Sequence, residues 1–397
     1  MSGRVIIVGG GIGGLCASIA LRQAGIETVL YEQAERFSEV GSGIQVWVKG
    51  MAALGQLGVA EQVRAVGADV NLHQFFTAGG APLYRADLAA FAHEYGAPAP
   101  VMVSRTGLVD ALLTGVDMTT VRLGRRVTDV RQDDAQVTVT LDDGSEDTGA
   151  LLIAADGINS ATRTRLFPEV RVRTASYRYA RSLVTHPAPF GANTFSMFFG
   201  RGNRIAIGDC GNGELYWLVG LKKPTVPLDG DNGNLKADLL RRFRSFPEGI
   251  ASVIEATDPA ALIHHAVRDV EPIPTWGKGR IFLLGDSAHA TTPNLGRGSG
   301  QAMLDAITLS ALLRTTDLTD NDQLARVLAD YSGRRKPEAE ALQRTSWSIG
   351  NITSWDSIAM TTARNFIMRT IAGRKQIAGI RAQFAEASTL TAATSGG

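Results

Sequence analysis

At three places in the sequence, glycine, carboxylate or arginine residues are spaced as they would be in a site that binds a ligand. The first cluster holds Gly9, Gly11, Gly13 and Gly14 and follows the apolar run of residues 5–8. Between a strand and a helix, the Gly-x-Gly-x-x-Gly pattern allows a tight turn, a close approach of backbone to a pyrophosphate, and close packing of the helix. The helix start adds unpaired N–H groups and a partial positive charge. We interpret the cluster as a dinucleotide-binding turn; the alternative is a purely structural glycine-rich turn.

An acidic residue stands where a dinucleotide site needs one. Residues 28–32 form the next predicted strand, and Glu32 ends it, with Gln33 beside it. A carboxylate at this place can accept hydrogen bonds from both hydroxyls of an adenosine ribose. It would repel the 2′-phosphate of NADP, because both groups are negative. The spacing therefore favours FAD or NAD, with Glu32 and Gln33 among the predicted contacts.

The second cluster follows a buried strand in the middle of the chain. Asp156 and Gly157 come directly after the apolar residues 151–155, and Ser160 and Arg163 follow. In α/β sheets the carboxyl ends of the strands form the edge at which ligands bind. Without the other clusters, a simpler interpretation is a helix start capped by Ser160, with Arg163 on a solvated face.

The third cluster has the same arrangement near residue 286. Gly285-Asp286 follows the predicted strand of residues 280–284, and a loop then leads into a helix. The loop and helix start hold Pro293, Gly296, Gly298 and Ser299. A strand-end Asp286 can bind a sugar hydroxyl, and backbone N–H groups at the helix start can stabilise a developing negative charge.

The hydrophobic pattern predicts the elements that must position these clusters. The chain opens as strand, turn, helix and strand, the pattern of a parallel βαβ unit. An antiparallel meander follows over residues 121–153, and a second set of alternating strands covers residues 176–222. Helical spacing then runs to the C-terminus, with a break or kink at Pro337 in the predicted helix over residues 322–342.

The composition of the chain bears on which classes of partner it could bind. The chain has 397 residues, with 40 Lys and Arg against 39 Asp and Glu, so the formal net charge is +1. This balance favours neither nucleic acid nor anionic membranes as partners. No apolar run reaches the roughly 18 residues that span a bilayer, and no signal peptide precedes the first strand, so we expect a cytoplasmic protein. Two cysteines, Cys16 and Cys210, cannot form a disulfide framework, and no metal site is expected.

Taken together and in this order, the three clusters resemble the class A flavoprotein monooxygenases, the para-hydroxybenzoate hydroxylase-like group. The resemblance extends from the first strand to about Ala306. It implies an α/β fold in which a Rossmann-like FAD-binding domain is interleaved with an antiparallel-sheet substrate domain and followed by C-terminal helices. The implied ranges are residues 1–70, 99–175 and 270–330 for the FAD-binding domain, 71–98 and 176–269 for the substrate domain, and 331–397 for the C-terminal helices.

The resemblance also implies roles for single residues. Glu32 would bind the adenosine ribose, and Arg105 would lie near the FAD pyrophosphate or ribityl chain. Asp286 would bind the ribityl or pyrophosphate portion. Asp156 and Arg163 would lie near the pyrophosphate and the transient path of the nicotinamide cofactor.

Within the family, residues 43–47, 200–204 and 291–293 look most like bacterial urate hydroxylases. The active-site arginine and tyrosine of that subfamily would fall on Arg204 and Tyr216. Arg204 would then pair with a substrate anion, and Tyr216 would serve as a hydrogen-bond or proton-relay group. Each has a structural alternative, since Arg204 could be an exposed strand residue and Tyr216 could be core packing.

The sequence departs from these relatives beside the expected flavin. Relatives often carry Asn or Cys at the position of Gly300, Gln at Arg297 and Glu at Leu304. The substrate therefore need not be urate. His289 follows the third cluster directly, and we expect packing rather than catalysis from it.

The activity implied is that of a FAD-dependent monooxygenase that consumes NADPH or NADH and hydroxylates a small aromatic or heteroaromatic substrate through a flavin C4a-hydroperoxide. Molecular oxygen would be the co-substrate, and Pro293 would fix the loop beside the flavin. The nicotinamide cofactor would bind transiently, because no second glycine pattern follows a strand. We expect a monomer or homodimer. Two alternatives stay open: a non-redox cyclase or isomerase with a structural FAD, and a FAD-dependent dehydrogenase.

Overall fold

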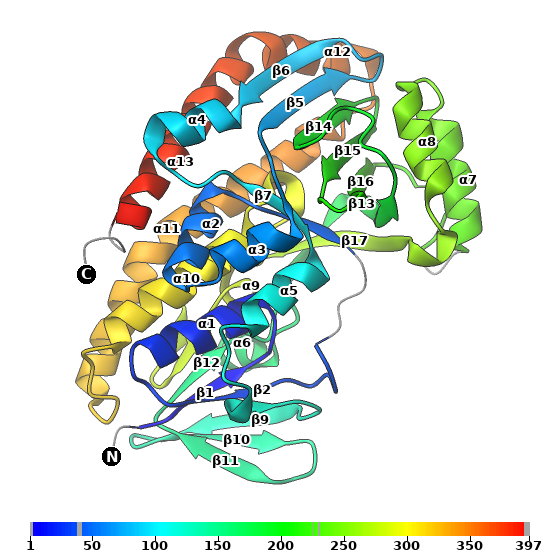
Figure 1. Cartoon of the computed structure of the whole chain (residues 1–397). Coiled ribbons are helices and arrows are strands. Elements are labelled where there is room, and N and C mark those ends of the chain that lie inside the picture. Colours follow the sequence, from blue (N-terminus) through cyan, green and yellow to red (C-terminus); the bar gives the residue numbers. More distant parts are fainter. Residues whose placement is uncertain (1–2, 38–41, 225, 229–230, 393–397) are drawn as a thin grey trace.

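The computed structural model describes residues 3–37, 42–224, 226–228 and 231–392 (Figure 1). Its first layer is a six-stranded sheet, parallel except at the β18 edge. The apolar strands at its centre are fully enclosed because helices and loops cover both faces. In spatial order the strands are β18 (Gly277–Lys278), β19 (Ile281–Leu283), β12 (Leu151–Ala154), β1 (Val5–Val8), β2 (Thr28–Tyr31) and β8 (Val121–Arg122).

Helices α1 (Ile12–Gln23), α5 (Arg105–Leu113) and α10 (Gly298–Leu313) pack together on one side of this sheet (Figure 1). An antiparallel meander of β9 (Val127–Gln132), β10 (Val137–Leu141) and β11 (Glu146–Gly149) extends the sheet region at the lower end of Figure 1. The short elements between these layers are η1 (Met118–Thr120), α6 (Ala161–Leu166), α9 (Asp286–His289) and η3 (Pro293–Leu295).

A seven-stranded sheet forms the second layer and is antiparallel except where β14 pairs with β5. In spatial order its strands are β17 (Ile263–Val270), β13 (Val172–Thr185), β16 (Glu214–Leu221), β15 (Asn203–Asp209), β14 (Thr194–Phe199), β5 (Leu72–Thr77) and β6 (Pro82–Asp87). Helices α7 (Asn232–Phe243) and α8 (Glu248–Ala256) and the turn η2 (Pro259–Ala261) cover its outer face. The inner face is therefore free to form one wall of a cavity.

A three-stranded sheet links the two layers. It consists of β3 (Gly43–Val46), β7 (Val101–Ser104) and β4 (Ala68–Asp69), with the helices α2 (Val48–Gln56), α3 (Ala60–Val66) and α4 (Leu88–Tyr95) nearby. Strand β3 reaches the inner face of the large sheet, where the ring of Tyr216 packs against the backbone of Gly43. No side chain larger than hydrogen fits at residue 43, because a Cβ there would overlap that ring.

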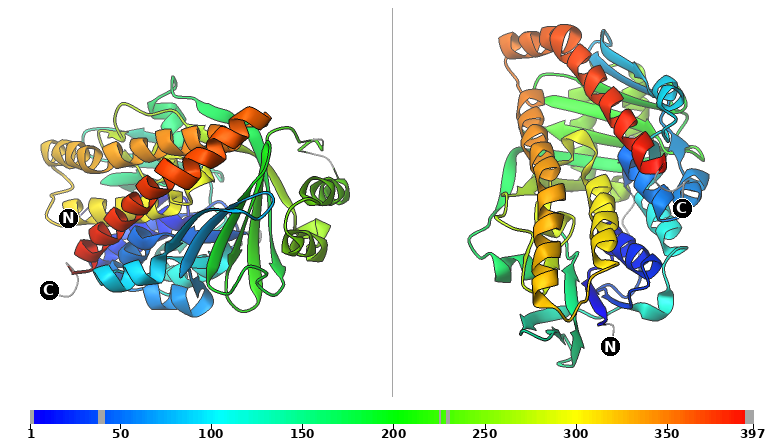
Figure 2. Two further views of the ribbon diagram at one scale, coloured as in Figure 1. Left: turned by 90° about the horizontal axis from the view of Figure 1, so that it is seen from above. Right: turned by 90° about the vertical axis from the view of Figure 1, so that its left-hand side faces the viewer.

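The C-terminal helices run back across both layers (Figure 2). They are α11 (Asn321–Thr353), α12 (Ile358–Ile367), the π-helical turn η4 (Met368–Ala372) and α13 (Gly373–Ala392). Of the predicted break or kink at Pro337, the break does not occur, since α11 continues through that residue. A proline removes only one helical N–H bond, and α11 is supported by its packing against α10.

The predicted α/β fold with C-terminal helices is confirmed, and the exact domain boundaries stay a prediction. Strand β1 leads into a glycine turn and α1, as the first cluster requires. Within the described residues, no helix is long and apolar enough to cross a membrane.

Candidate active site

All three sequence clusters border one cavity of about 610 Å³ between the two large sheets. We call it the central cavity. Gly11 and Gly13 of the first cluster line the central cavity. Asp286 of the third cluster and the loop that follows this residue also line the cavity. Gly157, of the second cluster, and Arg105 at the start of α5 also line it. Segments from opposite ends of the chain therefore meet around a single elongated space.

The glycines of the first cluster are of two kinds. At Gly9 and Gly14 the neighbouring atoms leave no room for a side chain, whereas Gly11 faces open space. Gly9 has a φ of +103°, and a Cβ there would meet the backbone of Ala155. A Cβ on Gly14 would overlap the carbonyl oxygen of Gly9. Gly11 differs, because nothing lies within 4 Å of the position where its Cβ would be. The backbone at Gly11 is thus bare toward the cavity, which fits a closely bound pyrophosphate.

Glu32 lies beside this turn and does not line the central cavity. Its carboxylate accepts hydrogen bonds from the N–H of Gly10 at 2.6 Å and of Ala34 at 2.8 Å. Gln33 follows on an exposed part of the chain. The Glu32 carboxylate is therefore held at the edge of the glycine turn, where it could also accept ribose hydroxyls.

In the second cluster, one carboxylate oxygen of Asp156 accepts the N–H of Thr162 at 3.2 Å. The other, Oδ1, is buried and has no hydrogen-bond partner in the described part of the chain. Buried acceptors without partners are rare in folded proteins, so this oxygen points to a missing donor. A nucleotide cofactor would supply hydroxyl donors.

Arg163 is only 2% exposed, so the solvated-face interpretation is wrong for it. Its guanidinium donates to the carbonyl oxygen of Ile158 at 2.6 Å and to that of Ser287 at 3.1 Å. Ser160 does cap helix α6, as that interpretation required, by accepting the N–H of Arg163. Arg163 therefore ties the second cluster to the third.

Asp286 begins α9 and faces the open volume of the central cavity. The protein that surrounds it on the other sides raises the pKa of its carboxyl, although Arg105, Arg163 and His289 act in the opposite direction. A neighbouring hydroxyl donor would stabilise the carboxylate there.

His289 lies behind this motif, away from the cavity. Its Nε2 is 2.5 Å from Oδ2 of Asp305, whose other oxygen accepts from Nε of Arg335 at 2.9 Å. Burial by itself raises the pKa of Asp305, but the charges of His289 and Arg335 outweigh it and hold the pKa below its usual value. The packing role expected of His289 agrees with this geometry, and Asp305 also accepts the N–H of Gly285 at 3.1 Å.

The loop between α9 and α10 forms a further part of the cavity wall. Helix α10 starts at Gly298. Pro293, Gly296, Gly298 and Ser299 all line the cavity. The N-terminal N–H groups of α10 therefore border the cavity, where they favour a negative charge.

Arg204 of β15 reaches the cavity and is 5% exposed. It donates hydrogen bonds to the hydroxyls of Tyr179 and Thr353 and to the side-chain oxygen of Asn294. Its guanidinium also stands 5.3 Å from the ring centre of Tyr177 and 5.4 Å from that of Tyr179. These contacts fix the guanidinium in place without neutralising its charge.

Tyr216 and Trp217 are neighbours on β16 and face opposite sides of the sheet. Tyr216 lines the cavity, and a hydrogen bond joins it to Arg181. Burial raises the pKa of the Tyr216 hydroxyl, which keeps it a neutral hydrogen-bond donor near neutral pH. Trp217 packs on the other face and donates to Thr257 at 2.9 Å. Arg181 was not singled out from the sequence as a cavity residue.

An aromatic wall closes the same end of the cavity. His73 stacks on Phe195 with ring centres 4.7 Å apart, and Phe75 lies 5.0 Å from His73. Burial lowers the pKa of His73 to about 3, so its ring is neutral at physiological pH. Sequence reasoning missed this wall, because the residues lie on strands whose pairing it could not derive. A flat aromatic ligand fits such a surface.

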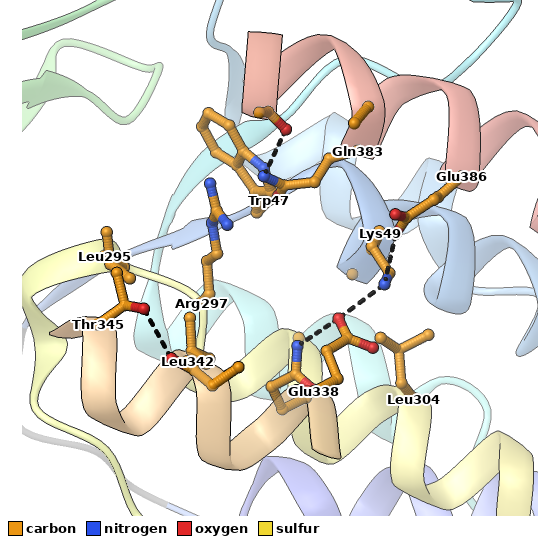
Figure 3. A pocket seen from close by; sticks show the side chains of 16 residues that line it. Trp47, Lys49, Leu295, Arg297, Leu304, Glu338, Leu342, Thr345, Gln383 and Glu386 are labelled. Carbon is orange, nitrogen blue, oxygen red and sulfur yellow. Dashed lines mark hydrogen bonds and ion pairs between the residues drawn. The ribbon is translucent and has the colours of Figure 1, made fainter. Parts of the chain in front are cut away.

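Arg297 and Trp47 separate the central cavity from an adjoining hollow of about 540 Å³ (Figure 3). The guanidinium carbon of Arg297 lies 5.3 Å from the Trp47 ring centre. Burial lowers the pKa of Arg297 to about 10, so it still carries its charge at neutral pH. Its Nε and the Nε1 of Trp47 are buried without a hydrogen-bond partner among the described residues.

The acidic side chains of the adjoining hollow are held by Lys49. Its ammonium bonds Glu338 at 2.7 Å and Glu386 at 2.9 Å, as the dashed lines of Figure 3 show. Within the described ranges, neither carboxylate forms an ion pair with Arg297. Arg297 is thus a cation at the cavity wall that is available to an anionic ligand.

Comparison with known proteins places these features in context. The family model described as "FAD binding domain" matches residues 3–197 and 252–346. The chain is 33% identical over 366 residues to aurachin C monooxygenase/isomerase of Stigmatella aurantiaca, covering 92% of this chain and 93% of that protein. It is 32% identical over 384 residues to FAD-dependent urate hydroxylase of Klebsiella pneumoniae, covering 95% and 97%. The crystal structure of Klebsiella pneumoniae HpxO complexed with FAD and uric acid matches with a TM-score of 0.88 and 30% identity, over 96% of each chain.

Proposed function

Because the chain belongs to the FAD-binding domain family and, within it, to the FAD-dependent monooxygenases, we propose that it hydroxylates a small aromatic or heteroaromatic substrate. Molecular oxygen and NADPH or NADH would be consumed. One oxygen atom enters the substrate in place of hydrogen as a hydroxyl group, and the other leaves as water. The nicotinamide cofactor supplies the two electrons that this balance requires.

The residues present fit FAD. The bare backbone at Gly11 and the N-terminus of α10 would hold its negatively charged parts, and Arg105 would add a positive charge. Glu32 would accept the ribose hydroxyls, and Asp286 would accept hydroxyls of the ribityl chain. When bound, FAD supplies the redox chemistry that makes oxygen reactive toward an electron-rich carbon.

This chain's own side chains would bind and orient the substrate. Arg204, held by Asn294 and Tyr179, offers a fixed positive charge on the large sheet. Tyr216 would donate a hydrogen bond or move a proton at its hydroxyl. The aromatic wall would exclude water and stack on the substrate ring, and Arg297 offers a second positive charge that lines the cavity.

The observation that carries the proposal is the continuity of the cavity from Gly11 to Arg204 and Tyr216. A cofactor and a substrate bound along it would share one enclosed space. The test is NADPH or NADH oxidation by the purified yellow protein in the presence of phenols, quinolones and purines. We expect one class to stimulate oxidation and to gain an oxygen atom from labelled molecular oxygen. A colourless protein that does not bind FAD, or oxidation without any labelled product across the panel, would contradict the proposal.

A second candidate is isomerisation or cyclisation with FAD in a structural role. It is supported by the relative named as a monooxygenase/isomerase. The altered positions Gly300 and Leu304, expected from the sequence to lie beside the flavin, line the adjoining hollow instead of the central cavity. Such an activity would give a product of unchanged mass without oxygen or nicotinamide. A dehydrogenase, the third possibility, would oxidise NADPH or NADH with an electron acceptor in place of oxygen and leave no labelled product.

A further inference from the structure

The exposed apolar side chains of this protein are concentrated at one place. Of the eight large apolar side chains exposed in the described residues, five lie between residues 352 and 367. Two of them, Ile358 and Phe366, are 66% and 68% exposed. The five residues are Ile352, Ile358, Met360, Phe366 and Ile367. Single exposed apolar residues are ordinary, but a contiguous group of this kind marks an interaction surface.

Helix α12 has its apolar side chains on the outside. The residues that it buries are Thr361 and Arg364, both polar, whereas Ile358, Met360 and Phe366 project away from the protein. A helix that merely covered the substrate sheet would turn its apolar face inward. Helix α12 also lies at one end of the molecule, and β1 lies toward the other end (Figures 1 and 2).

The charged residues that follow Asp356 have one sign over a long stretch. The sequence contains five basic residues and no acidic residue from 357 to 385. Among them Arg369, Arg374 and Lys375 are exposed and form no ion pair in the part of the chain that the structure describes. The nearest preceding acid, Asp356, is held by Lys222 at 3.1 Å and Lys223 at 2.9 Å. Exposed apolar residues followed by exposed basic residues are typical of a segment that binds at an anionic membrane surface.

The patch is continuous with the central cavity. Ile352 and Ile367 line that cavity, and they are also 39% and 48% exposed. They therefore stand at its mouth, between the interior and the exposed residues of α12. A surface that covers these exposed apolar residues would also face the opening of the central cavity.

We propose that residues 352–375, which we call the apolar-basic tip, dock on the anionic surface of a lipid bilayer and bring the mouth of the central cavity against it. This differs from the expectation drawn from the sequence, in which the balance of charges favoured no membrane partner. The net charge of +1 concealed the tip, because acidic residues elsewhere balance its basic ones. The docking does not depend on which reaction the cavity performs.

The test is co-sedimentation of the full-length protein with vesicles of phosphatidylcholine alone or of phosphatidylcholine mixed with phosphatidylglycerol. We expect binding to the mixed vesicles and a decline in binding as salt is raised, since salt screens the basic residues. The double variant Ile358→Ser with Phe366→Ser is expected to lower the partition coefficient about tenfold or more, because both apolar side chains leave the interface. The variant Arg374→Glu with Lys375→Glu tests the charge separately and should abolish the preference for phosphatidylglycerol.

The matched control is Val66→Ser with Met118→Ser, which removes two exposed apolar side chains elsewhere and should leave vesicle binding unchanged. Far-UV circular dichroism checks that each variant is folded. If the double serine variant does not fold, the variant Arg374→Glu with Lys375→Glu tests the proposal in its place. Failure of the wild-type protein to bind either vesicle would overturn the proposal, as would equal binding by wild type and tip variants. Light scattering that shows a dimer, dissociated by the tip substitutions, would identify the patch as an interface between copies and would also overturn it.

Discussion

Arg204 on β15 donates a hydrogen bond to the side-chain oxygen of Asn294, the residue directly after Pro293 in η3. One contact thereby joins the sheet expected to bind the substrate to the loop expected to border the flavin. Asn294 is in turn held by the hydroxyl of Tyr177 at 2.7 Å and by the backbone of Ser346 at 2.8 Å. The position of the Arg204 charge is therefore set by elements from four separate parts of the chain.

We predict that Arg204→Ala weakens the binding of an anionic substrate and leaves the FAD content unchanged. The loss of a hydrogen bond to a charged group corresponds to roughly 1.5–3 kcal/mol, about tenfold or more in affinity. Substrate-stimulated NADPH or NADH oxidation and flavin absorbance measure the two effects. Arg204→Lys keeps the charge but loses the paired geometry, so an intermediate affinity is expected. Unchanged kinetics in both variants would remove Arg204 from the substrate site.

Two glycines of the first cluster should behave differently when replaced by alanine. Gly11→Ala adds a Cβ in open space, so the apoprotein should keep its stability and lose FAD affinity about tenfold or more. Gly14→Ala forces a Cβ onto the Gly9 carbonyl and should lower the free energy of unfolding of the apoprotein by about 1–3 kcal/mol. Urea unfolding and FAD titration separate the effects. If Gly11→Ala binds FAD as the wild type does, the pyrophosphate does not lie against this turn.

Arg297 should strengthen the binding of an anion but lower the stability of the ligand-free protein. Its charge is buried without an ion pair among the described residues, so Arg297→Gln should raise the free energy of unfolding by roughly 1–2 kcal/mol near neutral pH. The pKa of Arg297 is about 10 when folded, below its usual value, because burial disfavours the charged guanidinium. The buried charge of Arg297 therefore destabilises the folded wild-type protein fully below pH 10, and this effect decreases as the pH rises through that value.

Thermal unfolding across this pH range measures the difference between the wild type and Arg297→Gln. The same variant should bind anionic aromatic substrates more weakly. Arg374→Gln, at an exposed position, is the control and should change stability by less than about 0.5 kcal/mol. A destabilised Arg297→Gln variant would show that the arginine has a stabilising partner.

Asp305 should stabilise helix α9, which begins with Asp286, since Asp305 holds His289, Arg335 and the N–H of Gly285. Asp305→Asn should lower the free energy of unfolding by about 3–5 kcal/mol at neutral pH, because it leaves buried charge uncompensated. The pKa of Asp305 is lowered in the folded protein, so its contribution is fully present above its unfolded value of about 3.9 and is lost as the pH falls through the folded pKa.

Urea unfolding at neutral and acidic pH checks this prediction. The difference between wild type and Asp305→Asn should shrink at the lowest pH values. Asp330→Asn, on an exposed position of α11, is the matched control and should have little effect. An equal difference at all pH values would mean that the carboxylate charge of Asp305 is not what stabilises helix α9.

The sequence by itself determined the glycine turn, its flanking strand and helix, and the order of the three clusters. These signals are local: an apolar run, a turn that requires glycine and a helical period lie within about twenty residues of one another. The family resemblance read from them is confirmed by the match to residues 3–197 and 252–346. The strand ends that carry Asp156 and Asp286 could be predicted for the same reason.

Only the tertiary structure decided which side chains share the central cavity. Whether Tyr216 or Trp217 faces inward depends on which face of β16 is covered by α7 and α8, and those helices follow later in the chain. His73 and Arg297 come from distant segments, and the apolar-basic tip exists because α12 packs through its polar residues. Such relationships depend on the pairing of strands and helices far apart in sequence, and a local pattern carries no information about that pairing.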